Sequence, residues 1–142
     1  MRRAFAGALA LQLLLAACTH AEAPLRVSDA WLRTMPAGAS NTAAYMTIEN
    51  RSREPRRLTA VTSPQFARAE LHETRIEDGM ARMRSVETLD LPPDTRVALA
   101  PGGMHLMLFD PVAPLAAGEH ATLRLQLDNG WLFEVQAEVR AP

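Results

Sequence analysis

Four side chains of this sequence belong to the types that bind soft metal ions, and none of them is a cysteine. They are two histidines and two methionines: His72, Met83, His105 and Met107. Imidazole nitrogen together with thioether sulfur is a ligand set suited to copper, above all Cu(I). Because a thioether carries no proton and forms no disulfide, such a site can work in an oxidising compartment. These residue types therefore predict a copper site built from all four side chains.

The segments that carry these residues have the pattern of short β-strands. Runs rich in valine, leucine and threonine are separated by proline, glycine and aspartate, and no helical period persists after the N-terminal apolar stretch. This pattern predicts an all-β sandwich or barrel. The expected strands are Arg26–Arg33, Ala44–Asn50, Arg57–Ser63, Ala67–Glu77, Met80–Leu91, Arg96–Leu99, His105–Phe109, Ala121–Asp128 and Trp131–Val139.

The expected register of one hairpin brings two of the four residues together. Asp78-Gly79 and Asn129-Gly130 are the strongest hairpin signals in the sequence. If Asp78-Gly79 is a two-residue turn, Thr74 faces Met83. His72 and Met83 are then diagonal neighbours on one face, with Cβ atoms about 7–8 Å apart. A one-residue bulge in this turn would move Met83 to the other face.

A separate strand carries the other two residues. The turn Pro101-Gly102-Gly103 precedes this strand, and its period of two places His105 and Met107 on one face. Leu106, Leu108 and Met104 then point the other way, into the core. Two ligands from the hairpin and two from this strand could complete a four-coordinate site.

The remaining methionines, histidines and aromatic residues are assigned roles other than metal binding. Packing is expected for Met35, Met46, Met80 and Met104, with Met80 and Met104 left open as additional ligands. His20 is assigned to a tether and His120 to a solvated loop. Core or rim positions are expected for Trp31, Tyr45, Phe66 and Trp131. The carboxylates of Glu70 and Glu73 are interpreted as solvent-facing.

The N-terminus has the pattern of a bacterial lipoprotein signal. Arg2 and Arg3 precede an apolar stretch that is too short to span a bilayer, and Leu15-Ala16-Ala17-Cys18 resembles a lipobox. We expect a signal peptide over residues 1–17, acylation of Cys18 and a tether over 18–24. One β-sandwich domain, over residues 25–142, would bind the copper. The alternative is an ordinary signal peptide cleaved near Ala23, which would discard Cys18.

Composition limits the partners of the mature chain. Removing Arg2 and Arg3 from the 15 basic residues leaves 13 against 16 acidic residues, a formal charge of −3. The only basic cluster, which we expect to line a solvated turn, is Arg51, Arg53, Arg56 and Arg57. No like-charge block and no interleaving of basic with aromatic residues suggests nucleic-acid binding. A lipid anchor would instead hold the chain to a membrane.

The whole mature chain resembles the PCuAC family of periplasmic copper chaperones. The family pattern is a histidine, ten residues, a methionine, twenty-one residues and then His-x-Met, and His72, Met83, His105 and Met107 match every spacing. Four sequence blocks also look like the family: Ala44-Tyr45-Met46-Thr47-Ile48, Glu70-Leu71-His72-Glu73, Gly79-Met80-Ala81-Arg82-Met83-Arg84 and Pro101-Gly102-Gly103-Met104-His105-Leu106-Met107-Leu108.

The resemblance implies a cupredoxin-like β-sandwich in the periplasm that binds one Cu(I) through these four residues. It also implies delivery of copper towards the CuA centre of cytochrome c oxidase, on subunit II, often alongside Sco-type thiol proteins. Some members carry a C-terminal tail rich in histidine and methionine that binds a second copper. The sequence given stops at Ala141-Pro142, so we do not expect a second site. Thr19 stands where an aspartate commonly retains lipoproteins in the inner membrane, which favours the outer membrane without deciding between the two.

The leading functional hypothesis is therefore a Cu(I) carrier, and the alternative is a storage or resistance protein that sequesters periplasmic copper. Both roles need the same ligands, so the sequence does not separate them. An enzyme or electron-transfer protein is not expected. Blue-copper centres require a cysteine thiolate, and the only cysteine is the proposed anchor Cys18.

Overall fold

The computed structural model describes residues 23–141, which form β-strands and their connections. Within this range no helix is long and apolar enough to cross a membrane. The predicted signal peptide, Cys18 and His20 lie outside the described residues. The strands are β1 (Leu25–Arg33), β2 (Asn41–Asn50), β3 (Arg56–Thr62), β4 (Phe66–Glu77), β5 (Met80–Val86), β6 (Leu89–Leu91), β7 (Thr95–Leu99), β8 (Met104–Pro111), β9 (His120–Leu127) and β10 (Leu132–Arg140).

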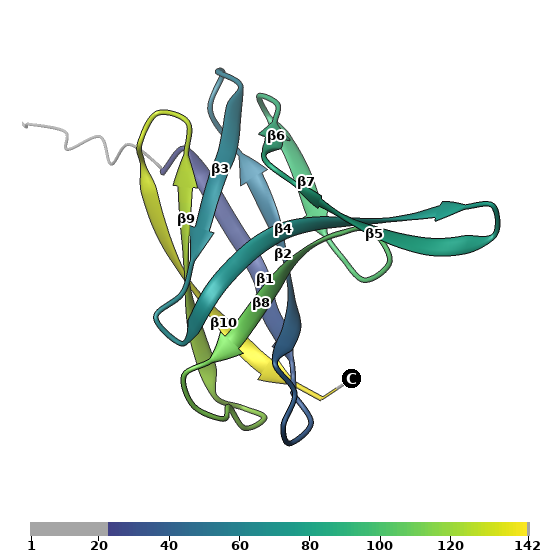
Figure 1. Cartoon of the computed structure of the whole chain (residues 1–142). Helices are drawn as coiled ribbons and strands as arrows, with labels where there is room; N and C mark the ends of the chain where they lie inside the picture. The colour runs from purple at the N-terminus through teal and green to yellow at the C-terminus, as the bar shows by residue number, and fades with distance from the viewer. Residues whose placement is uncertain (1–22, 142) are drawn as a thin grey trace, which may run out of the picture.

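The strands follow one hydrogen-bonded path that folds back on itself. Its order is β5-β4-β8-β2-β1-β10-β9-β3-β6, and β7 pairs with the second half of β2. Every pairing is antiparallel except the short one between β1 and β10, which joins the two layers of the sandwich (Figure 1). This arrangement confirms the predicted all-β sandwich.

Alternating side chains from both layers fill the core. On β9, Leu123, Leu125 and Leu127 are buried whereas Arg124 and Gln126 are exposed, as the period of two predicts. Burying each leucine side chain contributes roughly 1.5–3 kcal/mol to folding. From the other layer, Ile48, Leu106 and Leu108 point into the same cluster. Because β2 and β8 bury these residues, their alternate residues lie on the outer face of that layer.

The expected single strand Met80–Leu91 is wrong. The chain leaves β5 after Val86 and starts β6 at Leu89, and the two strands pair with different partners. β5 pairs with β4, whereas β6 pairs with β3 in the other layer. No proline or glycine stands between the two segments, so the sequence pattern did not reveal the change of layer.

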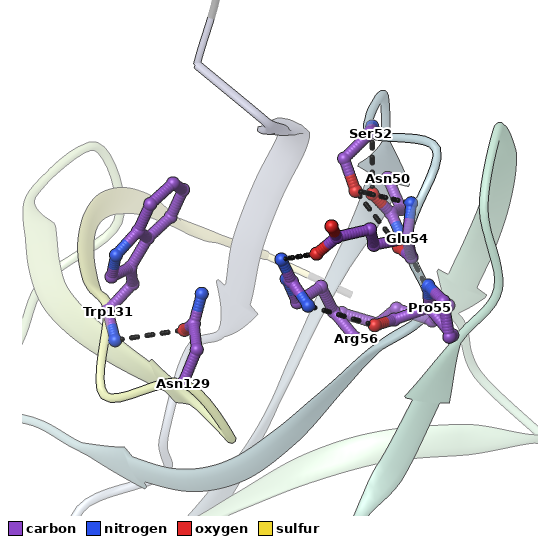
Figure 2. A network of polar contacts seen from close by, with 8 residues as sticks. Asn50, Ser52, Glu54, Pro55, Arg56, Asn129 and Trp131 are labelled. Atoms are coloured by element: carbon purple, nitrogen blue, oxygen red, sulfur yellow. Dashed lines mark hydrogen bonds and ion pairs between the residues drawn. The ribbon is translucent and has the colours of Figure 1, made fainter.

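The predicted arginine-rich turn lies between β2 and β3, where a buried asparagine organises it (Figure 2). The Asn50 amide donates to the carbonyl oxygens of Glu54 and Leu91, both at 2.8 Å, and its carbonyl accepts from Ser52. Arg56 forms an ion pair with Glu54. Arg51 likewise pairs with Glu49 and Arg57 with Asp90.

The hairpin of β4 and β5 extends beyond the sandwich as an arm (Figure 1). Pairing between β4 and β8 ends where Glu73 faces Met104, although β4 continues to Glu77. The backbone N–H of Thr74 still donates to the carbonyl of Gly103, at 3.1 Å. Beyond this point β4 pairs with β5 alone among the described strands.

Candidate metal centre

The turn at the tip of the arm sets the register of the first two candidate ligands. Asp78 and Gly79 have φ angles of 53° and 76°, as a two-residue type I′ turn requires at both positions. Thr74 therefore faces Met83, and His72 faces Ser85. This register confirms the prediction. His72 and Met83 lie on one face of the arm because Thr74 shares that face with both.

Strand β8 brings the other two candidate ligands to the same face. It lies between β4 and β2, with His105 directly opposite His72 and Met107 directly opposite Glu70. The rings of His72 and His105 have centroids 6.1 Å apart. The alternate β8 residue Leu106 is fully buried on the core side, as expected. The four predicted residues thus occupy three adjacent strands and one outer face.

The four side chains differ in their exposure to solvent. His105 is 4% exposed and the His72 side chain 15%, whereas Met83 is 53% exposed and Met107 is half-buried. The imidazoles therefore lie at the base of the centre and Met83 at its solvent side. An ion held here would be reached from the side of Met83.

Hydrogen bonds leave one nitrogen lone pair of each imidazole for a metal. Nδ1 of His105 donates to the carbonyl of Gly103, at 2.9 Å, so its Nε2 carries the lone pair. Nε2 of His72 donates to the carboxylate of Glu70, also at 2.9 Å. Nδ1 of His72 is buried and has no hydrogen-bond partner. Because buried polar atoms are normally paired, this nitrogen fits a metal ligand.

Glu70 has a role that the sequence interpretation missed. It was expected to face solvent, but its carboxylate accepts from His72 and also pairs with Arg68. The hydrogen bond from His72 lowers the pKa of Glu70, Arg68 adds to the effect and partial desolvation opposes it. A carboxylate behind a ligating histidine fixes its ring and tautomer. The signal was present, since Glu70 lies two positions before His72 on the same face.

Aromatic rings surround the imidazoles, and two of them, Trp31 and Tyr45, lie at core or rim positions as expected. The Tyr45 ring is 6.4 Å from that of His105 and packs against Trp31 at 4.6 Å. On the other side, Phe109 lies 6.3 Å from His72, and the guanidinium of Arg68 covers Phe109 at 4.2 Å. These rings limit the access of water to the two histidines from the body of the sheet.

The other methionines lie away from the centre. Met80 faces Glu77 on the reverse face of the arm and is 56% exposed, so the expectation that it packs or assists the site is wrong. Met104 faces Glu73 on that reverse face and packs against the core, so it does not assist either. Met46 is buried, as expected. His120 is exposed, but it begins β9 instead of lying in a loop.

The four candidate ligands would form a mixed imidazole–thioether centre. Within residues 23–141 no three His, Cys, Asp or Glu side chains are grouped so as to hold a metal. Two imidazoles and two neutral thioethers favour a soft ion such as Cu(I).

The fold and this face define a small β-sandwich domain that carries two histidines and two methionines on the outer face of one of its two layers. The chain belongs to the LpqE-like family, described as "Putative lipoprotein LpqE-like", whose model matches residues 25–139. A relative from Leifsonia xyli subsp. xyli, itself named as a lipoprotein, is 31% identical over 82% of this chain and 69% of its own. An uncharacterized protein from Rickettsia prowazekii is 27% identical over 77% of this chain and 62% of its own.

Solved structures confirm the resemblance to PCuAC domains. The copper-bound PCuAC domain from PmoF2 superposes with a TM-score of 0.72 at 28% identity, covering 84% of this chain and 95% of that one. The solution structure of CuI-DR1885 from Deinococcus radiodurans has a TM-score of 0.64 at 32% identity, over 78% and 74% of the two chains. The apo PCuAC domain from PmoF1 is similar, with a TM-score of 0.71 at 28% identity over 84% and 96%.

Proposed function

We propose that this chain is a periplasmic copper chaperone that binds one Cu(I) through His72, Met83, His105 and Met107. The observation that carries the proposal is the unpartnered, buried Nδ1 of His72. It lies on the same sheet face as three further soft ligands. The copper-bound PCuAC domain from PmoF2 and CuI-DR1885 have the same fold, which supports copper as the ion.

The chemistry of these ligands suits a carrier. Neutral thioethers and imidazoles hold Cu(I) without a thiolate that must be reprotonated or oxidised on release. The gradient of exposure, from His105 at 4% to Met83 at 53%, supports ordered exchange. An acceptor would replace the exposed thioether first, while the buried imidazoles still hold the ion.

The proposed acceptor is the CuA centre on subunit II of cytochrome c oxidase, with a Sco-type thiol protein as a second candidate partner. Acylation of Cys18 is proposed to hold the chain to the periplasmic side of a membrane. The lipoprotein names of the family and of the Leifsonia relative support this anchor. The signal peptide over residues 1–17 and the tether over 18–24 belong to the same proposal.

X-ray absorption on the purified protein loaded with one equivalent of Cu(I) tests the site. We expect a mixed nitrogen–sulfur shell that loses sulfur in Met83→Leu and Met107→Leu variants. The matched control is Met80→Leu, because Met80 lies on the reverse face of the same arm. If Cu(I) binding survives a Met83→Leu, His105→Ala double substitution unaltered, the site is wrong.

A copper-transfer experiment distinguishes a chaperone from a storage protein. Copper-loaded protein is mixed with the apo soluble domain of oxidase subunit II, and the copper content of both proteins is measured after separation. A chaperone gives up its copper to the oxidase domain. A storage protein keeps it, and that result would replace delivery by sequestration as the function.

A further inference from the structure

The arm formed by β4 and β5 has two chemically different faces. Its reverse face carries a continuous set of charges: Glu73, Arg75, Glu77, Arg82 and Arg84. These charges pair with one another, with Arg75 to Glu73 at 2.7 Å, Arg84 to Glu77 at 2.8 Å and Arg82 to Glu77 at 3.5 Å. The reverse face is therefore a solvated surface on which each of these five charged side chains has an ion-pair partner.

The opposite face of the arm, which continues the metal centre outward, carries no charged side chain. Its residues are Thr74 and Ile76 on β4 and Ala81 and Met83 on β5. Ile76 is 71% exposed, more than Met83 at 53%. We name this group of four residues the arm face. Single exposed apolar residues are common, but here the exposed isoleucine adjoins a candidate ligand on a face without charged side chains.

The register fixes the distance between Ile76 and Met83. Ile76 faces Ala81 and Thr74 faces Met83, so Ile76 and Met83 are diagonal neighbours with Cβ atoms about 7–8 Å apart. An incoming donor atom must come within about 2–2.3 Å of the ion it takes over. A protein that reaches an ion held by Met83 therefore also covers Ile76.

We propose that the arm face is the docking surface for the protein that exchanges copper with this chain, a partner whose own metal site has an uncharged, apolar rim. This inference rests on the proposed function. A charged rim would be desolvated against Ile76 and Met83 without compensation, and the charges that could pair with it lie on the reverse face. A small apolar contact gives a short-lived complex, which suits a carrier that must leave after transfer.

Substitution of two exposed apolar residues on opposite faces of the arm tests the proposal. Ile76→Glu places a charge on the arm face, and Met80→Glu places the same charge on the reverse face, at a residue that is 56% exposed. Neither residue is a candidate ligand. Thermal unfolding of both variants checks that the fold is retained.

Each variant, loaded with Cu(I), gives two transfer rates. One acceptor is the apo soluble domain of oxidase subunit II, and the other is the small chelator bathocuproine disulfonate, which needs no docking surface. For Ile76→Glu we expect transfer to the protein to slow by roughly tenfold or more while transfer to the chelator stays unchanged. For Met80→Glu we expect both rates to match the wild type.

Two results would overturn the docking surface while leaving the copper site in place. In the first, Ile76→Glu transfers copper to the oxidase domain at the wild-type rate. In the second, Met80→Glu slows that transfer as much as Ile76→Glu does. Sedimentation of the copper-loaded wild type gives a third. If copies of this chain associate and Ile76→Glu abolishes that association, the arm face binds a second copy and not the partner. Absence of Cu(I) binding by the wild type, by contrast, would overturn the proposed function itself.

Discussion

His72 and His105 face each other across β4 and β8 and hold opposite tautomers. Their ring centroids are 6.1 Å apart, and each ring donates one N–H to a fixed acceptor, Glu70 for His72 and the Gly103 carbonyl for His105. The first ring therefore presents Nδ1 and the second presents Nε2. The pair is oriented before any ion arrives, since both hydrogen bonds are made within the protein.

Removal of the carboxylate behind His72 should weaken metal binding without removing a ligand. For Glu70→Ala we expect Cu(I) affinity to fall by about 10–100-fold, with the same number of nitrogen and sulfur ligands by X-ray absorption. Glu70→Gln keeps an acceptor for Nε2 of His72, so its Cu(I) affinity should fall by less than that of Glu70→Ala. Glu73→Ala is the control, because Glu73 pairs with Arg75 on the reverse face. An unchanged affinity in Glu70→Ala would show that Glu70 does not orient His72.

The lowered pKa of Glu70 makes part of the metal-free stability depend on pH. The hydrogen bond from His72 holds this pKa below its ordinary value of 4.5 in the folded protein. The stabilisation is therefore present above the ordinary value and is lost as pH falls through the lowered value. Urea unfolding should show the wild type more stable than Glu70→Gln at pH 7, and the two should converge in acid. A difference that persists undiminished in acid would contradict this assignment.

Copper affinity should fall as the solution becomes acidic. Protons compete with the metal for imidazole, whose ordinary pKa is about 6.5, but not for thioether sulfur. Competition titrations between pH 8 and pH 5 should show weaker Cu(I) binding at lower pH, with partial retention through Met83 and Met107. An affinity that is flat across this range would exclude histidine ligation.

The core behind the centre should tolerate truncation poorly. Leu106, between His105 and Met107, is 0% exposed on the opposite face of β8, so Leu106→Ala should cost about 2–5 kcal/mol of unfolding free energy. Leu132→Ala is the control, since Leu132 is 66% exposed and its truncation should change stability by no more than about 0.5 kcal/mol. Equal losses in the two variants, measured by urea unfolding, would mean that the layers do not pack as described.

Local patterns in the sequence were enough to predict several parts of this structure. The Asp78-Gly79 turn fixed the register that puts Thr74 opposite Met83, because a type I′ turn allows one pairing of its flanking strands. The alternation of Leu123, Leu125 and Leu127 with polar residues predicted the buried face of β9. These features depend on neighbours along the chain, so the sequence alone determines them.

Only the tertiary structure decided which strands lie side by side. A period of two tells which residues share a face of a strand, but not which strand pairs with it. For that reason the sequence did not show that β8 adds to β4, with His105 opposite His72. Nor did it show that β6 leaves β5 for the other layer. The packing of the His105 ring near Tyr45 of β2 and of the His72 ring near Phe109 of β8 likewise depends on which strands are neighbours, which long-range contacts determine.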